Sequence, residues 1–242
     1  MSKSLEVYEA IPESAIVIVA HPDDAEFMVA GTVARWARGG ARVAFLLVTD
    51  GDKGSSDPSM RREDLAALRR AEQLDACNVL GVETLEFLHY EDGMVEPTLA
   101  LRKDIARVIR KFRPQVAICQ DPSRFYSGRG YINHPDHRAV AEAALGAIYP
   151  AARDRHTFPE LLAEGLEPHK VREVFIGFTE DEDLIVDISA TIDAKVNALK
   201  AHKSQVGDWD PMSTLSEWAQ GAAEGQAFTH GETFRYIKLE DE

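Results

Sequence analysis

Short runs of β-branched and aliphatic residues alternate with longer helical patterns through most of the chain, and this alternation restricts the fold more than any other feature. The run Ile-Val-Ile-Val-Ala at 16–20 is typical of a strand that is buried on both faces. A helical pattern follows at about 25–37, and Gly39-Gly40 ends it. Strands separated by helices of this length predict right-handed crossovers and a mostly parallel sheet.

The same order recurs along the rest of the chain. Further strands are predicted at 43–48, 84–88, 115–119, 173–178, 184–188 and 234–239, and further helices at about 59–80, 98–112, 135–148 and 191–204. The helix at 59–80 is expected to turn Leu65, Leu68 and Leu74 toward a core. The acidic run at 180–183 suggests a hairpin between the two strands that flank it.

These elements predict an α/β fold with a Rossmann-like, mostly parallel sheet that has helices on both faces. Residues 150–170 fit no element and suggest a surface excursion. The chain contains no linker, internal repeat or low-complexity segment, so residues 1–242 are expected to form a single domain.

The acidic composition narrows the range of functions. The formal net charge is -14, from 41 acidic against 27 basic residues, and this charge repels phosphate backbones and anionic membrane surfaces. We therefore expect no nucleic-acid binding, and no membrane insertion because no apolar run approaches the ~20 residues that span a bilayer. Cys77 and Cys119 lie in helix-like and strand-like runs, which favours buried free thiols. The N-terminus lacks the pattern of a secretory signal, so a cytoplasmic location is expected.

The first predicted strand ends directly in the polar turn His21-Pro22-Asp23-Asp24. Pro22 fixes φ and stiffens the turn, which holds His21 and Asp24 in a defined relation. One imidazole and one carboxylate at this spacing can face a single ion, and catalytic Zn²⁺ usually takes three such N and O ligands. This turn is therefore a candidate metal site.

The start of a later predicted helix carries a second polar cluster, Asn133-His134-Pro135-Asp136-His137. Asn133 or His134 can cap the helix, and Pro135 suits its first turn. His134 and His137 can both point into one cleft, and Asp136 can accept a hydrogen bond from an imidazole N–H and fix its tautomer.

Each cluster alone has an ordinary structural explanation. A lone His-Pro-Asp is usually a turn, and an acidic residue at a helix start is favoured by capping and by the helix dipole. However, both clusters follow a predicted parallel strand, so both open onto the edge of the sheet where α/β folds bind ligands. Together they predict one shared site.

The paired motifs resemble the LmbE-like (PIG-L) family of zinc-dependent N-deacetylases. This family includes N-acetylglucosaminyl-phosphatidylinositol deacetylase and the deacetylases of mycothiol and bacillithiol synthesis. The resemblance covers roughly residues 15–205. Weaker matches occur in the same order at Thr49–Gly54 (with Asp52 where Glu is usual), Leu68–Glu72, Asp92-Gly93 and Lys195–Gln205.

The resemblance implies the metal ligands and the base. His21, Asp24 and His137 would hold Zn²⁺, although Fe²⁺ or another divalent ion also fits such ligands. Asp23 would be the general base that activates water, and would later deliver a proton to the leaving amine. Ala25 stands where many members have Glu, but a subset of the family shares the Ala-Glu sequence found here.

The resemblance also implies roles for four further residues. His134, oriented by Asp136, would stabilise the oxyanion of the tetrahedral intermediate or protonate the amine. Arg69 and Asp92 match positions that contact substrate. The loop at 124–131 is either a solvated loop or a substrate lid, whose aromatic residues stack on a ring and whose arginines meet an anionic group.

The implied function is hydrolysis of an N-acetyl or other N-acyl group on an amino-sugar conjugate or similar small molecule. The resemblance also suggests a homo-oligomer. One alternative is an amidase that acts on a larger amide, such as a thiol–sugar conjugate. Another is a non-catalytic, metal-containing sugar-binding module, which is disfavoured because structural zinc sites usually have four protein ligands. A dinucleotide-dependent oxidoreductase is also disfavoured, because no Gly-x-Gly-x-x-Gly turn follows the first strand.

Overall fold

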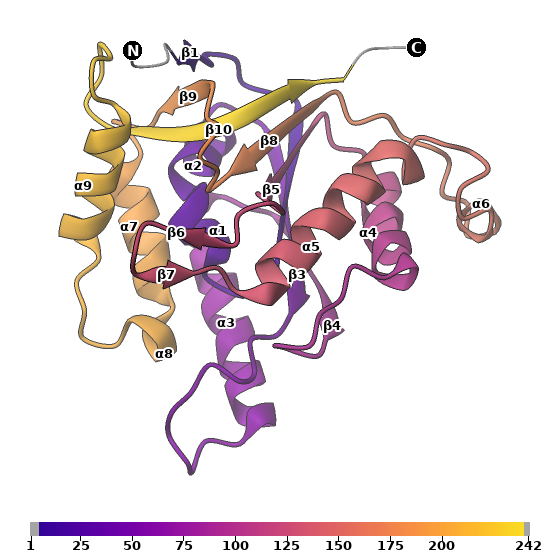
Figure 1. Cartoon of the computed structure of the whole chain (residues 1–242), viewed down its shortest axis with the longest axis horizontal. Helices are drawn as coiled ribbons and strands as arrows, with labels where there is room; N and C mark the ends of the chain where they lie inside the picture. Colours follow the sequence, from indigo (N-terminus) through magenta and orange to yellow (C-terminus); the bar gives the residue numbers. More distant parts are fainter. Residues whose placement is uncertain (1–4, 240–242) are drawn as a thin grey trace.

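The computed structural model describes residues 5–239, whose backbone is organised around one large sheet (Figure 1). The sheet has eight strands in the order β1-β9-β10-β8-β5-β2-β3-β4. These strands are β1 (Glu6–Val7), β2 (Ser14–Val19), β3 (Arg42–Thr49), β4 (Thr84–Tyr90), β5 (Val116–Gln120), β8 (Glu173–Gly177), β9 (Leu184–Asp187) and β10 (Gly231–Lys238). Neighbouring strands are parallel except where β10 pairs with β8 and β9. The predicted mostly parallel sheet is confirmed.

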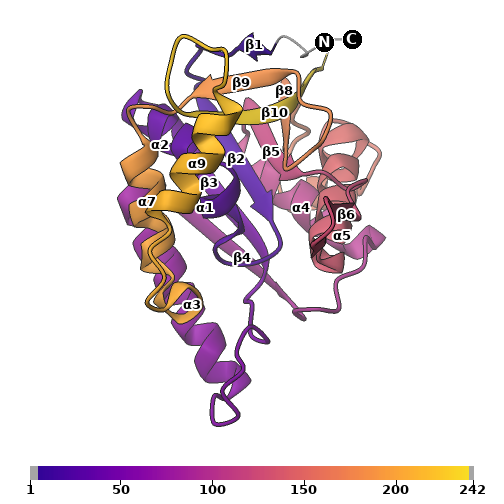
Figure 2. The same ribbon diagram turned by 60° about the vertical axis from the view of Figure 1, so that its left-hand side comes forward.

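Helices cover both faces of the sheet, as the sequence predicts (Figure 2). One face carries α1 (Asp24–Met28), α2 (Ala30–Arg38), α3 (Arg62–Leu80), α7 (Ile192–Ala201) and α9 (Met212–Ala222), with α8 (Lys203–Val206) beside α3 and α7. The other face carries α4 (Leu99–Phe112), α5 (Pro135–Gly146), the π-helical turn η1 (Ala147–Ala151) and α6 (Glu160–Ala163).

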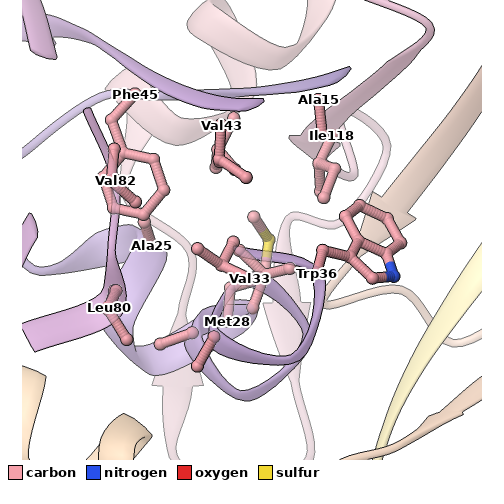
Figure 3. Close-up of a cluster of buried hydrophobic side chains, with 14 of the residues drawn as sticks. Ala15, Ala25, Met28, Val33, Trp36, Val43, Phe45, Leu80, Val82 and Ile118 are labelled. Carbon is pink, nitrogen blue, oxygen red and sulfur yellow. The ribbon is translucent and has the colours of Figure 1, made fainter. Parts of the chain in front are cut away.

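The core consists of one apolar layer on each side of the sheet. Because side chains alternate along a strand, Val17 and Val19 of β2 enter one layer, whereas Ile16 and Ile18 enter the other. Figure 3 shows part of the first layer, where Trp36 of α2 is completely buried. Burial on both faces makes β2 a central strand, so its carboxyl end is fixed in the middle of the molecule.

β2 lies where the strand order reverses. From β2 the chain proceeds through β3 to β4 on one side, and then crosses to β5 and β8 on the other. Loops that leave the strands on either side of such a point diverge and leave a crevice for ligands. Figure 2 shows the end of β2 between α1 on one side and, on the other, α5 and the hairpin of β6 (Tyr126–Ser127) and β7 (Tyr131–Ile132). The two polar clusters lie in the loops that follow β2 and β5.

Two of the predicted elements are wrong in detail. The helix expected at 25–37 is divided into α1 and α2, because Val29 has a non-helical φ of -138°. The hairpin expected around 180–183 does not form, because β10 is inserted between β8 and β9. Asp183 supports this insertion, since its carboxylate accepts hydrogen bonds from the backbone N–H of Tyr236 and from the guanidinium of Arg235.

The inward face of α3 is also different from the prediction. Leu65 is buried, but Leu68 and Leu74 are 40% and 53% exposed. The buried stripe continues instead through Arg69 and Gln73, at intervals of four residues. The helix turns polar side chains inward because it lies behind the polar end of β2.

The segment at 150–170, which the sequence leaves unassigned, packs against α4. The buried guanidinium of Arg110 donates hydrogen bonds to backbone carbonyls of this segment, those of Ala151, Ala152, Asp154, Thr157 and Leu166. Cys77 and Cys119 are buried free thiols, as expected. Within residues 5–239, no helix is long and apolar enough to cross a membrane.

Candidate active site

The turn after β2 holds Asp24 with one carboxylate oxygen anchored and the other free to bind. Asp24 Oδ2 accepts hydrogen bonds from the backbone N–H groups of His21 and Ala20, at 2.8 and 3.2 Å. The other oxygen, Oδ1, lies 3.0 Å from His137 Nε2. The backbone of Asp23 adopts a left-handed φ of 87°, which turns the chain sharply between His21 and Asp24.

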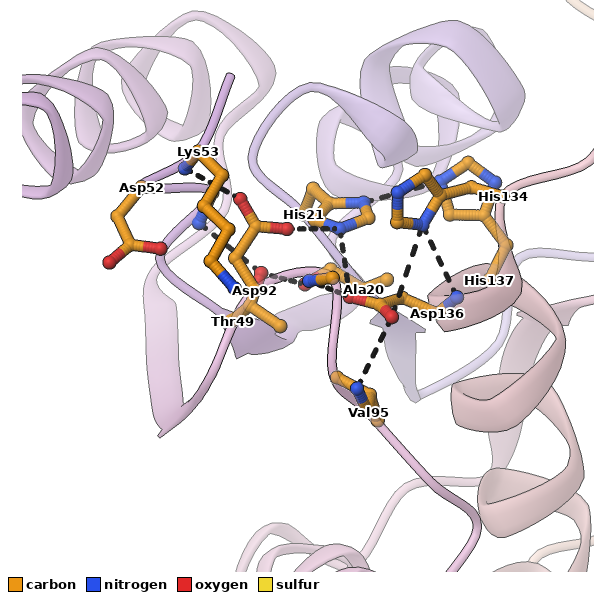
Figure 4. Close-up of polar contacts among 12 residues, drawn as sticks. Ala20, His21, Thr49, Asp52, Lys53, Asp92, Val95, His134, Asp136 and His137 are labelled. Carbon is orange, nitrogen blue, oxygen red and sulfur yellow. Dashed lines mark hydrogen bonds and ion pairs between the residues drawn. The ribbon is translucent and has the colours of Figure 1, made fainter. Parts of the chain in front are cut away.

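The start of α5 presents His137 in the same way. Its Nδ1 lies 3.0 Å from the side-chain oxygen of Asn133, so this nitrogen is the one that carries the proton in the neutral ring. Nε2 is left as a lone pair that points toward His21. His21 Nδ1 lies 3.2 Å from His137 Nε2, which brings the two clusters into direct contact (Figure 4).

His21 is oriented by two carboxylates from elsewhere in the fold. Its Nε2 lies 3.1 Å from Asp92 Oδ1 and 3.3 Å from Asp136 Oδ2. In histidines that bind a metal, the ring nitrogen that does not bind the metal usually faces a carboxylate or another acceptor. Burial disfavours the imidazolium, but contacts with Asp136, Asp24 and Asp92 outweigh burial and raise the pKa of His21 well above its usual range. The site therefore attracts a cation strongly.

The donor atoms His21 Nδ1, Asp24 Oδ1 and His137 Nε2 fit a small divalent ion. With metal–ligand bonds of ~2.0–2.1 Å, the ligand atoms of a tetrahedral zinc site lie about 3.3 Å apart. His21 Nδ1 lies 3.2 Å from His137 Nε2, and His137 Nε2 lies 3.0 Å from Asp24 Oδ1, so both separations are close to this value. His21 Nδ1 also lies 3.6 Å from the other oxygen of Asp24, Oδ2. In each of the three residues, the side-chain nitrogen or oxygen that is not a donor atom contacts another protein group. These contacts preorganise the three donor atoms.

Two groups of three side chains have donor atoms that all lie within 4.8 Å of one another: His21 with His134 and His137, and His21 with Asp92 and Asp136. The second group uses His21 Nε2, which is the nitrogen that faces away from His137. Its carboxylates are better explained as partners that orient His21 than as ligands. In the first group, His134 is the most exposed of the three, with 42% of its side chain accessible.

The expected pairing of Asp136 with His134 is not formed. Asp136 Oδ1 lies 4.0 Å from His134 Nδ1, which is beyond hydrogen-bonding distance. The Asp136 carboxylate instead accepts hydrogen bonds from the backbone N–H groups of Gly93 and Val95 and lies against His21. His134 Nδ1 accepts a hydrogen bond from the backbone N–H of Asp136 at 3.2 Å, as an N-cap. In a neutral ring this leaves the proton on Nε2.

Asp23 is adjacent to the donor atoms but is held separately. Its Oδ2 lies 3.1 Å from Arg69 Nη2, and its backbone N–H donates to Gln73 Oε1 at 3.2 Å. Burial raises the pKa of Asp23 to about 6; the charge of Arg69 opposes this rise and that of Asp24 adds to it. A carboxyl group with such a pKa can accept a proton near neutral pH.

Arg69 and Asp92, which the resemblance assigns to substrate contact, both line the cavity but are largely occupied by protein partners. Arg69 donates to the backbone carbonyls of Pro22 and Gly51, at 2.6 and 2.9 Å, in addition to its contact with Asp23. Asp92 accepts from the backbone N–H of Lys53 and faces His21, and these contacts outweigh burial and lower the pKa of Asp92 to about 2. Both side chains are therefore placed to orient other site residues.

A buried polar network continues behind Asp23. Gln73 Nε2 donates to Glu26 Oε1 at 2.7 Å, and Glu26 Oε2 lies 3.4 Å from His202 Nε2. Glu26 and His202 are completely buried. His202 therefore packs behind Asp23 as part of this network.

The sequence motifs predict Asn133 only as a helix cap and assign no role to Gln73. The position of Asn133 beside the histidines is the signal for its contact with His137. Gln73 could have been found from its spacing, four residues after Arg69 on one face of α3.

His21, Asp23, Asp24 and His137 line a cavity of about 1070 Å³. Its lining also includes aromatic and aliphatic side chains, those of Phe27, Tyr131, Ile132, Phe178 and Trp218. Arg124, Ser127 and Tyr131 of the loop at 124–131 also line it, and the structure folds this loop into the β6–β7 hairpin. The loop therefore forms part of the cavity wall.

Comparison with known proteins relates this geometry to a family. The family model PIG-L, described as GlcNAc-PI de-N-acetylase, matches residues 16–148, which is more than half of the chain. The diacetylchitobiose deacetylase of Thermococcus kodakarensis is 30% identical over 227 residues, covering 92% of this chain and 83% of that protein. A Bacillus subtilis protein described as "Probable N-acetyl-alpha-D-glucosaminyl L-malate deacetylase 2" is 30% identical over 202 residues, covering 80% of this chain and 83% of that protein.

A solved structure agrees with these sequence matches. The N,N'-diacetylchitobiose deacetylase of Pyrococcus horikoshii, complexed with its inhibitor MPG, superposes with a TM-score of 0.83 at 26% sequence identity. The superposition covers 94% of this chain and 84% of the other. The similarity therefore includes the C-terminal part of the chain, beyond the region that the family model matches.

Proposed function

Because the chain belongs to the LmbE-like (PIG-L) family of N-deacetylases, we propose that it removes the acetyl group from the nitrogen of an N-acetylglucosamine conjugate. The observation that carries this proposal is the convergence of His21 Nδ1, Asp24 Oδ1 and His137 Nε2 beside the carboxylate of Asp23. Deacetylases of N-acetylglucosamine derivatives among the relatives support the choice of substrate.

His21, Asp24 and His137 would hold one divalent ion, with zinc as the leading candidate and Fe²⁺ as an alternative. When bound, the ion would supply Lewis-acid activation of water and of the amide carbonyl. Three protein ligands are the number typical of catalytic zinc sites, whereas structural sites usually have four. This arrangement argues against a purely structural metal in a sugar-binding module.

Asp23 is proposed as the general base. It accepts a proton from the attacking water as the new C–O bond forms at the acetyl carbonyl carbon. Arg69 holds the carboxylate in place at 3.1 Å, and a pKa of about 6 leaves Asp23 ionised at neutral pH. The same proton is then available to the amine when the C–N bond breaks, so the products are acetate and the free amine.

His134 is proposed to stabilise the oxyanion. Burial, together with the charge of His21, lowers the pKa of His134, so its ring is neutral near pH 7. Its Nδ1 accepts the backbone N–H of Asp136, which leaves Nε2–H free to donate to the carbonyl oxygen as charge develops. Asp136 is proposed to act indirectly, since its carboxylate contacts His21 and its backbone N–H donates to His134 Nδ1.

A direct test measures primary-amine release and acetate release together. The metal-loaded protein is incubated with N-acetylglucosamine, with N,N'-diacetylchitobiose and with N-acetylglucosaminyl malate, and EDTA-treated protein serves as the control. We expect equal amounts of amine and acetate from at least one substrate, and loss of both after EDTA treatment. Release of neither product by the metal-loaded protein would show that the proposed function is wrong. Cleavage of only larger amides would instead support the amidase alternative.

A further inference from the structure

We propose that a subsite next to the candidate active site binds an uncharged ring, such as a second pyranose, attached to the reacting amino sugar. This inference rests on the proposed function and specifies the substrate class. A second cavity of about 190 Å³ adjoins the main one, and both are lined by Phe27, Arg124, Phe178 and Trp218. We call these four residues, together with the second cavity, the outer subsite.

The volume of the main cavity exceeds what one amino sugar needs. Sites for small molecules typically measure ~300–1,000 Å³, and 70–90% of a drug-sized ligand is buried in them. At about 1070 Å³ the main cavity lies at the top of this range even without the adjoining space. A single pyranose would therefore fill only part of the space that the two cavities provide.

The outer subsite presents aromatic side chains to a ligand. Trp218 of α9 is 55% exposed and lines both cavities, so its ring is available for stacking against the apolar face of a sugar ring. Phe178, just after β8, is 37% exposed and has a left-handed φ of 53°, a strained conformation for a residue with a bulky side chain. Arg124 Nη1 donates to the Phe178 carbonyl at 2.8 Å and helps to hold this conformation.

The charges around the outer subsite favour a neutral ligand. The second cavity is lined by two cationic side chains, Arg124 and Lys195, and by two anionic ones, Glu182 and Glu232. Lys195 and Glu232 form a buried ion pair at 2.6 Å, which leaves no net charge from this pair for a ligand. Arg124 and Glu182 both line this cavity, so its lining offers no excess of positive charge to an anionic group.

Lys53, which lines the main cavity, does not supply an excess of positive charge either. Lys53 Nζ lies 3.1 Å from Glu91 Oε1, and Asp92 accepts the backbone N–H of Lys53. The conjugate that the geometry favours is therefore a neutral disaccharide-like molecule. A conjugate with a dicarboxylic acid fits less well.

Kinetics on Trp218→Ala test this inference. In the parent, we expect kcat/KM to be higher for N,N'-diacetylchitobiose than for N-acetylglucosamine or N-acetylglucosaminyl malate. The preference for the disaccharide is the ratio of two kcat/KM values, that for N,N'-diacetylchitobiose divided by that for N-acetylglucosamine. Trp218→Ala should lower this ratio by about five- to tenfold, which is the size of an aromatic stacking contribution. Trp218→Phe should restore most of this ratio. Glu217→Ala, at the neighbouring exposed position of α9, is the matched control and should leave the ratio unchanged.

Each failure has a distinct meaning. An unchanged ratio in Trp218→Ala would overturn the stacking role, and a parent preference for the malate conjugate would overturn the charge argument. If no substrate is deacetylated, the proposed function itself fails. The subsite is then tested by binding of N,N'-diacetylchitobiose to the zinc-loaded protein by calorimetry, and equal affinity in the parent and in Trp218→Ala would overturn it.

Discussion

The side-chain oxygen of Gln73 accepts a hydrogen bond from the backbone N–H of Asp23 at 3.2 Å, and this contact joins α3 to the turn that carries the candidate base. The backbone of Asp23 is in the left-handed region, where an aspartate needs support from its surroundings. The other end of the Gln73 amide donates to Glu26 at 2.7 Å. Gln73 therefore fixes the backbone of Asp23, while Arg69 fixes its carboxylate.

Replacing Gln73 with Ala should weaken both the fold and the reaction. Because Gln73 is buried, the substitution leaves the Asp23 N–H and a Glu26 oxygen without partners, which costs about 1–3 kcal/mol of unfolding free energy. We expect kcat to fall by roughly tenfold, with a smaller change in KM, as is typical when a supporting contact of a site is lost. Urea denaturation and steady-state kinetics measure the two effects. Asn78→Ala, on the exposed side of the same helix, is the control.

Substitutions of Asp23 and His137 should separate catalysis from metal binding. Asp23→Asn keeps the size of the side chain but removes the base, so turnover should fall by about 10²–10⁴-fold while zinc content stays near one per chain. His137→Ala should lower both turnover and zinc content, because it removes a ligand. Atomic absorption on purified protein, combined with the amine-release assay, measures these outcomes. Full activity in Asp23→Asn would exclude it as the base.

The sequence was sufficient to predict the fold and to bring the two clusters together. Buried strands leave a strong local pattern, and the carboxyl ends of neighbouring parallel strands meet at one edge, so His21 and His137 could be expected to lie close. The placement of β10 could not be predicted, because it depends on contacts of Asp183 with residues more than fifty positions away. Similarly, Arg110 organises the segment at 150–170 through backbone carbonyls, which have no signature in the sequence.

Predictions about orientation were less successful than predictions about position. The sequence placed Asp136 beside His134, but the carboxylate turns toward His21, because the backbone N–H groups of Gly93 and Val95 hold it there. In α3, the apolar residues Leu68 and Leu74 suggested an inward face that Arg69 and Gln73 occupy instead. Helical periodicity favours apolar residues for the buried face, so it fails where a helix supports a polar site.

Substitutions of Arg69 should shift the pH dependence of the reaction. The charge of Arg69 lowers the pKa of Asp23, so Arg69→Gln should raise that pKa, and the acid limb of the kcat/KM profile should move to higher pH. Arg69→Lys keeps the charge and should move the limb less. The measurement is kcat/KM between pH 5 and 9, with thermal melting to confirm that both variants are folded. An acid limb that does not move, or moves to lower pH, would show that Arg69 does not tune Asp23.

The buried pair of His202 and Glu26 should make stability depend on pH in a defined direction. Burial alone would lower the pKa of His202, but the nearby Glu26 carboxylate outweighs burial and raises it above the ordinary value of 6.5. A group with a raised pKa in the folded state contributes its full stabilisation below its unfolded pKa and loses it as the pH rises through the folded value. The advantage of the parent over His202→Asn should therefore be largest below pH 6.5 and should shrink at higher pH. Urea denaturation in EDTA at pH 5.5 to 9 measures this difference without a contribution from bound metal, and His156→Asn, at an exposed position, is the control. A difference that grows with pH would mean that His202 is buried in its neutral form.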